Sequence, residues 1–161
     1  MEKITLTVQD VMVSPVYVIS INETARSAAK IMESKEIGCL VIMEKDQVAG
    51  ILTERDLINR VIVDGKDPEK TLVKDIMSKP PVVAKPELSL EEAVRVMFVN
   101  KIKKLIIVEE KGKEKSLAGL VTLTDIARIN PALIKLLKNL FEEERLVPPK
   151  RMEKTMRYYV V

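Results

Sequence analysis

The hydrophobic and polar positions follow the same order twice along this chain of 161 residues. Each copy opens with a short apolar run, VYVI at 16–19 and PVVA at 81–84, whose β-branched residues predict a buried strand. A helix is expected after each run, capped by Thr24 in the first copy and begun by the capping box Ser89–Glu92 in the second. The apolar face of each helix is expected at Ala25, Ala28, Ala29 and Met32 in the first copy and at Leu90, Ala93, Val94, Met97 and Phe98 in the second.

Two further apolar runs and a second helix complete each copy. Charged residues separate CLVIM from VAGIL in the first copy and LIIVEE from LAGLV in the second, as expected for hairpin strands. The last helix is predicted from Thr53 to about Val63 in the first copy and from Thr122 to about Ile129 in the second. The order is therefore β-α-β-β-α, twice, which predicts an α+β fold.

The two copies stay in register over most of their length. VQDVM at Val8–Met12 is answered by VKDIM at Val73–Met77, 65 positions later. GILTERD begins at Gly50 and GLVTLTD at Gly119, so the offset has grown to 69 and four residues have entered the second hairpin. A polar loop tip tolerates such an insertion, and the chain is interpreted as a tandem duplication.

The duplication predicts two domains and a tail. Residues 1–68 and 69–130 are expected to form one unit each, and residues 131–161 a C-terminal helix and basic tail. A unit of about 60 residues buries too little surface to be very stable on its own. We therefore expect the units to pack face to face about a pseudo-twofold axis, with equivalent positions opposite each other in a central cleft.

The phrase Gly-x-x-Thr-x-x-Asp has two interpretations. Thr at a helix start and an acid three residues later form a capping box, which alone explains the spacing. Asp is shorter than the Glu or Gln that capping boxes prefer, so its use in both copies favours a further role. The turn aims backbone N–H groups at the cleft, and a carboxylate one turn later can accept hydrogen bonds from a vicinal diol. The phrase therefore suits a ribose-phosphate, and its Gly permits close backbone approach.

From Val8 to Asn130 the whole pattern resembles a pair of CBS domains, as in the γ subunit of AMP-activated protein kinase and many archaeal stand-alone proteins. The resemblance rests on the lead motifs DVM and DIM, the strands IGCLVI and IKKLIIV, and the phrases GILTERD and GLVTLTD. It implies adenosine nucleotides (AMP, ADP or ATP, with S-adenosylmethionine less favoured) bound in the clefts between the units. It also implies flat dimers.

The resemblance assigns the polar contacts to the ligand. Asp56 and Asp125 match the ribose-diol ligands, and Thr53 and Thr122 match the hydroxyls near ribose and phosphate. Arg55 matches a basic phosphate contact, whereas its counterpart in the second unit is neutral. The phosphate-facing basic pair is expected at Lys103 and Lys104, for which a solvated strand end is the alternative.

The apolar lining of an adenine slot is implied by the same resemblance. Val18 and Val83 stand where the family often has Thr in the first strand, so one polar contact is missing from each site. The sites also differ in charge and need not bind equally. The residues implied to line the slot are Val16, Val18, Ile37, Val83 and Ile102.

Composition narrows the chemistry. Histidine is absent, which removes the commonest general base and most zinc sites, and no catalytic residue, metal site or catalytic cofactor is predicted. Cys39 is the single cysteine and, within IGCLVIM, is expected in the core. A chain without a disulfide, a signal peptide or an apolar run of about 18 residues favours a cytoplasmic setting and no membrane span. Charged residues make up 32%, rich in Lys and Glu, as on hyperthermophile surfaces.

The tail carries two further patterns. An apolar stripe after Pro131 is expected to dock on its own domain or on a dimer mate, and the acidic run Glu142–Glu144 opposes a membrane-surface role. Segment 150–161 carries a charge of +3, equal to that of the whole chain, and its YYVV end suggests a strand seeking a sheet edge. The stripe comprises Leu133, Leu136, Leu137, Leu140 and Phe141.

The sequence therefore favours a non-enzymatic sensor of adenine nucleotides that forms a homodimer and is read by a regulated partner protein. One alternative is a structural dimerisation module with empty sites. Another is a nucleic-acid-associated regulator acting through the basic tail, which a lone basic segment supports weakly. An enzyme is the least favoured interpretation, because the usual catalytic residues are missing.

Overall fold

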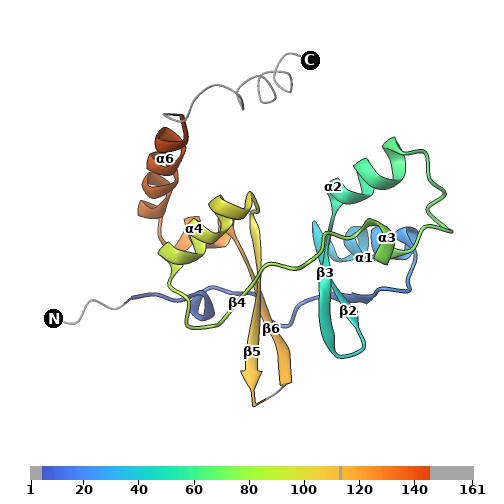
Figure 1. Ribbon diagram of the computed structural model, residues 1–161, viewed down its shortest axis with the longest axis horizontal. Coiled ribbons are helices and arrows are strands. Elements are labelled where there is room, and N and C mark those ends of the chain that lie inside the picture. The colour runs from blue at the N-terminus through green and yellow to red at the C-terminus, as the bar shows by residue number, and fades with distance from the viewer. Residues whose placement is uncertain (1–4, 113, 146–161) are drawn as a thin grey trace.

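The chain folds into two units, each built on one three-stranded sheet (Figure 1). This computed structural model describes residues 5–112 and 114–145. The first unit contains β1 (Val18–Ser20), α1 (Ala25–Lys35), β2 (Cys39–Glu44), β3 (Gln47–Thr53), α2 (Glu54–Leu57) and the π-helix η2 (Ile58–Val63). The second contains β4 (Val83–Ala84), α4 (Leu90–Asn100), β5 (Lys104–Lys111), β6 (Glu114–Thr122) and α5 (Leu123–Ile129). Two short helices precede the units, η1 (Val8–Asp10) and α3 (Val73–Ile76), and α6 (Ala132–Arg145) follows them.

Strand pairing confirms the predicted β-α-β-β-α order in both units. β1 runs parallel to β2, which pairs antiparallel with β3, and β4, β5 and β6 repeat this arrangement. The first strands are shorter than the apolar runs that predicted them. β4 begins at Val83, because Pro81 has no N–H to donate to the ladder. β1 begins at Val18, although the Tyr17 carbonyl already accepts a hydrogen bond from Val41 N at 3.2 Å.

The helices that cross between the parallel strands begin where their sequences predict. Thr24 caps α1 and Ser89 caps α4, each accepting a hydrogen bond from the backbone N–H three residues later. Four of the five residues predicted for the inner face of α4 are buried, and Phe98 is partly buried. On α1 the expectation for Ala29 is wrong, because the buried stripe follows Ala25, Ala28 and Met32 and Ala29 lies beside it, exposed.

The last helix of the first unit is not the single α-helix expected from Thr53 to about Val63. α2 has only four residues, and the π-helix η2 continues it. β-branched residues fill most of η2, and a wider turn relieves their crowding against the preceding turn. In the second unit α5 is a regular helix that ends at Ile129, as predicted.

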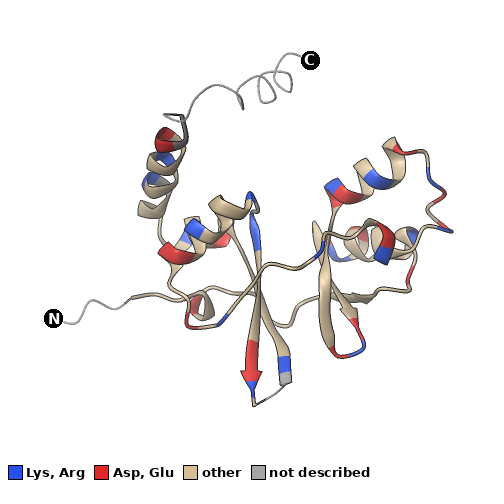
Figure 2. Cartoon of the chain, viewed as in Figure 1, with Lys and Arg blue, Asp and Glu red and all other residues tan. Residues whose placement is uncertain are grey.

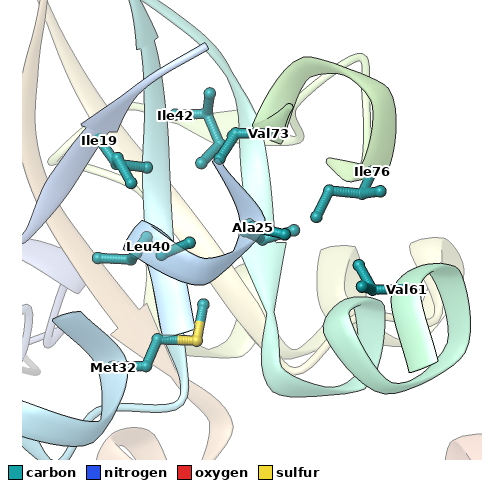
Figure 3. Close-up of a cluster of buried hydrophobic side chains, with 10 residues drawn as sticks. Ile19, Ala25, Met32, Leu40, Ile42, Val61, Val73 and Ile76 are labelled. Carbon is teal, nitrogen blue, oxygen red and sulfur yellow. The ribbon is translucent and has the colours of Figure 1, made fainter. Parts of the chain in front are cut away.

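Each unit's core is completed by the segment that precedes the other unit in the sequence. Val8 of η1 is fully buried in the second unit's cluster with Leu90 and Val121. Val73 and Ile76 of α3 are fully buried among the side chains of the first unit (Figure 3). The blue N-terminal segment and the green linker in Figure 1 are these two crossings. The repeated motifs VQDVM and VKDIM therefore interlock the two units.

A third apolar cluster joins the two sheets. Val41 of β2 and Ile106 and Val108 of β5 are buried in it, and Ile51 and Leu120 pack against it. β3 and β6 are in contact as well. The units therefore pack sheet to sheet, as expected from their duplicated pattern.

The glycine of each Gly-x-x-Thr-x-x-Asp phrase lies under a crossing segment. A Cβ on Gly50 would lie 2.6 Å from the carbonyl oxygen of Ser78, and one on Gly119 would lie 2.5 Å from Met12 Sδ. A Cβ would be crowded at both positions because the crossing segment lies directly on the strand, with backbone against Gly50 and the Met12 side chain against Gly119. The bridges that join segment to strand are Ile51–Ser78 and Val13–Leu120.

The tail helix α6 docks on the second unit. Leu133, Leu136 and Leu137 pack against the core of that unit, and the ring of Phe141 meets that of Phe98 edge-on at 5.1 Å between centroids. Of the two docking surfaces predicted for the stripe, the chain's own domain is thus observed. The basic segment 150–157 and YYVV lie outside the described residues. Among the helices that are described, none is long and apolar enough to cross a membrane.

Charges of both signs lie on the helices and at the hairpin tips (Figure 2). Lys85 Nζ lies 2.9 Å from the Glu110 carboxylate, and Lys115 Nζ lies 3.5 Å from its other oxygen. The hydrogen bond and charge of Lys85 lower the pKa of Glu110, and the same contact raises the pKa of Lys85. Exposed pairs of this kind contribute little singly, so the fold depends mainly on its apolar clusters.

Candidate functional site

The first Thr–Asp pair lies where β3 passes into α2. Thr53 Oγ1 accepts a hydrogen bond from Asp56 N at 3.3 Å. In return, Asp56 Oδ2 accepts from Thr53 N at 2.9 Å and from Thr53 Oγ1 at 3.0 Å. These contacts form a complete capping box, so one carboxylate oxygen and the Thr hydroxyl are held by the backbone turn itself.

The second pair, at the junction of β6 and α5, has the same geometry. Asp125 Oδ2 accepts from Thr122 N at 3.0 Å and from Thr122 Oγ1 at 2.7 Å. Thr122 Oγ1 accepts from Asp125 N at 3.1 Å. Both Thr and both Asp residues are partly buried, so each pair meets solvent along one side.

These distances correct one argument from the sequence. The shortness of Asp, compared with the Glu or Gln that capping boxes prefer, favoured a further role, but Asp makes the return bond in both units. The return bond forms because the carboxylate of the third helical residue points back at the cap residue's N–H. Only the Oδ1 atom of each Asp is left for another partner, and this atom distinguishes the two pairs.

In the first unit the Oδ1 atom of Asp56 already has two partners. Ser78 Oγ donates to it at 3.4 Å, and Arg60 Nη1 lies 3.5 Å away as an ion-pair partner. The same Arg60 nitrogen donates to the carbonyl oxygen of Ile76 at 2.6 Å, which fixes the guanidinium over the carboxylate. The Asp56 side chain is only 13% exposed. Its carboxylate is therefore engaged on both oxygens.

In the second unit apolar residues replace both of these partners. The repeat places Val13 opposite Ser78 and Ile129 opposite Arg60, and the two matching bridges to β6 and β3 confirm the first equivalence. Val13 is 56% exposed and Ile129 is 55% exposed. Among the side chains that the structure describes, none donates to or pairs with the Oδ1 atom of Asp125. The second pair thus presents an open carboxylate oxygen.

The three predicted cations lie near the ends of strands. Arg55 is exposed in the first turn of α2, and Lys103 is exposed just before β5. Lys104 is partly buried and is the strand partner of Thr122. None of the three forms an ion pair with any described residue, so their charges are available to a ligand. Whether they face phosphate remains a prediction.

The residues implied to line an adenine slot are not gathered into one cluster. Val18 and Val83 are 45% and 40% exposed on the short edge strands β1 and β4. Val16 packs against the cluster between the sheets. Ile37 and Ile102 follow the left-handed ends of α1 and α4 and pack against the separate cores of the two units. Of these five residues, Val16, Val18 and Val83 are the ones accessible from the interface between the two units.

Cys39 is buried, as expected for a core cysteine. Burial raises the pKa of its thiol, the charge of Lys104 opposes this rise, and the charge of Glu54 adds to it. In the described part of the chain, no group of His, Cys, Asp and Glu side chains could hold a metal ion.

Two open hollows lie on the surface away from the Thr–Asp pairs. One, of ≈ 530 Å³, lies between β1 and α1, and the other, of ≈ 460 Å³, lies beside the Lys85–Glu110 pair. Neither is lined by a Thr or Asp of the repeated phrase, so the chemistry of the phrase and not hollow size defines the candidate site. The first is lined by Val18, Ile19, Ser20, Glu23, Ser27, Lys30 and Ile31.

Arg60 and Ser78 are site residues that the sequence interpretation missed. Arg60 lies one helical turn beyond Asp56, and Ser78 reaches it from a segment 22 residues further along the chain. The signal that could have found them is the repeat itself. At these two positions of the repeat, a charged and a polar residue in one copy correspond to two apolar residues, Ile129 and Val13, in the other.

Comparison with known proteins identifies the family. The model of the CBS domain matches residues 8–63 and 73–131. The chain therefore belongs to the CBS domain family and is a CBS-domain pair, a regulatory module. The repeat, the fold and the matched residues agree on this assignment.

Relatives of the chain include archaeal, bacterial and plant proteins. It is 41% identical over 113 residues to an uncharacterized protein of Methanopyrus kandleri, covering 70% of this chain and 56% of that protein. The CBS domain-containing protein YhcV of Bacillus subtilis is 34% identical over 120 residues, covering 74% of this chain and 82% of YhcV. The chain thus spans little more than half of the first relative and most of the second.

Solved structures share the fold. A conserved CBS domain protein of Thermoplasma acidophilum superposes with a TM-score of 0.71 at 27% identity, covering 78% of this chain and 69% of that one. The hexameric CBS-CP12 protein from bloom-forming cyanobacteria superposes with a TM-score of 0.68 at 32% identity, covering 77% and 67% respectively. CBS proteins of this fold therefore include an oligomer.

Proposed function

We propose that the protein is a regulatory sensor that binds an adenine nucleotide, AMP, ADP or ATP, between its two CBS units. The observation that carries the proposal is the Thr–Asp pair, placed identically at the end of the third strand in both units. A carboxylate that keeps an oxygen for a ligand can accept from a vicinal diol. Ribose is the part of a nucleotide that presents such a diol.

The charges of the ligand and the site are complementary. Because the capping bonds occupy Oδ2 and the Thr hydroxyl, the diol would donate to Oδ1, and the phosphates would extend toward the cations at the strand ends. Arg55, Lys103 and Lys104 form no ion pair with a described residue, and a phosphate would give them one. The adenine ring would lie against the exposed valines of β1 and β4.

Sensing requires that the ligand bind two arrangements of the units with different affinity. The interface offers an element that can differ between them, since the small cluster around Val41 and Ile106 joins the two sheets. A ligand touching both units would bias how they pack, and a partner protein would read the change. We also propose a homodimer, because Ile58, Ile62 and Val63 leave an apolar stripe exposed along η2.

Calorimetric titration of the full chain with AMP, ADP, ATP and S-adenosylmethionine tests the proposal. At least one of the three adenine nucleotides should bind, and Asp56→Asn/Asp125→Asn should weaken it roughly 10- to 150-fold through loss of charge-assisted hydrogen bonds. Asn preserves the cap in large part, so melting should change little.

The chain supplies a matched control. Asp10 forms a capping box with Thr7, accepting from Thr7 N at 2.8 Å, but it lies in η1 and outside the duplicated turn. Asp10→Asn should leave nucleotide affinity unchanged. Unchanged affinity in the double variant with unchanged melting would show that the repeated acids only cap helices.

A further inference from the structure

The two Thr–Asp turns share the same capping bonds but differ in the partners of the Oδ1 atom of the acid. In the first turn Arg60 and Ser78 both reach Oδ1 of Asp56, at 3.5 Å and 3.4 Å. In the second turn the equivalent positions hold Ile129 and Val13, and no described side chain reaches Oδ1 of Asp125. The difference at Oδ1 lies in these two side chains, because the capping bonds of the two turns are the same.

We infer that Arg60 and Ser78 hold the first turn closed, so that Asp125 is the open diol acceptor and the chain binds one nucleotide. The inference rests on the proposed function and assigns its ligand to one of the two turns. A diol that approached Asp56 would have to displace an ion pair and a hydrogen bond from a side chain that is 13% exposed. At Asp125 the same diol displaces only solvent.

The closure is a built feature of the interlocked fold. One nitrogen of Arg60, Nη1, contacts both the Asp56 carboxylate and the Ile76 carbonyl oxygen, the latter at 2.6 Å. Ile76 is fully buried in the first core, and Ser78 is fixed to β3 by a bridge with Ile51. The crossing segment therefore carries both the carbonyl that orients Arg60 and the hydroxyl that donates to Asp56.

The two apolar residues at the second turn explain why the Oδ1 atom of Asp125 stays open. Val13 and Ile129 cannot donate a hydrogen bond, so they leave the Oδ1 atom of Asp125 without a partner. Both are more than half exposed, which places apolar surface beside an open acceptor. Arg128, the cation next in sequence to Ile129, forms no ion pair with Asp125 or another described acid. Apolar surface next to a diol acceptor suits a nucleoside better than it suits water.

Carboxylate labelling tests the closure without any nucleotide. The full-length chain is treated with a water-soluble carbodiimide and glycine ethyl ester, and the modified peptides are followed by mass spectrometry. Asp125 should react at least about five-fold faster than Asp56, the factor expected for an acid free of an ion pair. In Arg60→Ile/Ser78→Val, which copies the second turn, the Asp56 rate should rise to that of Asp125. Equal rates in the wild type would overturn the inference.

Titration with the nucleotide that binds best then tests occupancy. The wild type should bind one molecule per chain, and Arg60→Ile/Ser78→Val should bind two with affinities within about ten-fold of each other. Stoichiometry that stays at one with an unlocked Asp56, or a wild type that already binds two, would overturn the inference. Weaker binding by the variant would also overturn it, by showing that Arg60 contacts the ligand.

A reciprocal variant covers the case in which loss of the Arg60–Ile76 contact loosens α3. Val13→Ser/Ile129→Arg copies the lock onto the second turn at two exposed positions and leaves the first core untouched. It should slow labelling of Asp125 about five-fold and weaken the wild-type site about ten-fold. No change in either would overturn the inference. Unequal labelling with no nucleotide bound by any form would support the closure and sink the proposed function.

Discussion

The two glycines of the repeated phrase should differ in how badly they tolerate alanine. The Cβ of Gly50→Ala would lie 2.6 Å from the Ser78 carbonyl oxygen, whereas that of Gly119→Ala would meet Met12, at 2.5 Å from Sδ and 3.1 Å from Cβ. Neither glycine has a positive φ, so the backbone itself accepts alanine. The difference is therefore steric, between a backbone atom and a flexible side chain.

The structure gives the magnitudes. Ser78 O accepts from Ile51 N at 3.2 Å and Ser78 N donates to Ile51 O at 2.9 Å, so the carbonyl cannot move without stretching both bonds. Overpacking of about 1–3 kcal/mol plus about 0.5–1.5 kcal/mol for a weakened hydrogen bond predicts roughly 2–4 kcal/mol for Gly50→Ala. Gly119→Ala should cost about 0–2 kcal/mol, because Met12 can change rotamer and alanine restricts the unfolded chain.

Double-mutant cycles measured by urea unfolding make the comparison decisive. Met12→Ala should rescue Gly119→Ala, with a favourable coupling of about 1 kcal/mol, because the new methyl group occupies the space that Met12 leaves. Met77→Ala should rescue Gly50→Ala by less than about 0.5 kcal/mol, because the Ser78 carbonyl remains in the way. Equal losses for the two alanine variants, or equal rescue, would refute the idea that Gly50 lies under a fixed backbone.

Two further outcomes are expected. Arg55→Gln and Lys103→Gln/Lys104→Gln should weaken the binding of ATP more than that of AMP, because a triphosphate gains more from each cation, and the difference should shrink at high salt. Lys135→Gln on α6 is the control, and equal losses of affinity for both ligands would contradict the assignment. Burial raises the pKa of the Cys39 thiol, so native protein should react with Ellman's reagent at least about ten-fold more slowly than unfolded protein, and labelling as fast as in urea would show an open thiol. For the same reason, the free energy of unfolding should fall as pH rises above the thiol pKa of the unfolded chain, and Cys39→Ala should remove this trend.

Local patterns were enough to predict most of the secondary structure. The α4 face at Leu90, Ala93, Val94 and Met97 follows from helical spacing, and the hairpins follow from two apolar runs around a charged turn. Such signals depend on neighbours within one or two turns, so they can be read from one chain. The π-helix η2 was missed because crowding among β-branched residues changes the turn without changing the apolar period.

The interlock could not be predicted in the same way. Apolar residues at Val8 and Val73 indicate burial, but periodicity does not say against which unit a segment packs. η1 contributes to a core formed mainly by residues beyond 80, and α3 to one formed mainly by residues before 62. The Thr–Asp positions were visible because both partners lie three residues apart. The partners of Oδ1 were not, because Ser78 comes from the crossing segment.

The interlock explains how two copies of one phrase can acquire different roles. Each Thr–Asp turn belongs to one unit, but the residue beside it, Ser78 or Val13, belongs to the segment that leads into the other unit's first strand. Val13 lies five residues before Val18 of β1, so a ligand bound at Asp125, as we propose, would lie beside the segment that leads into the first unit's sheet. At Asp56 the same connection leads through Ser78 to β4, and the Arg60 contact already holds it in place. Under the proposed function, a single open turn would therefore suffice to couple ligand binding to both units, because the crossing segment beside it connects them without a second ligand.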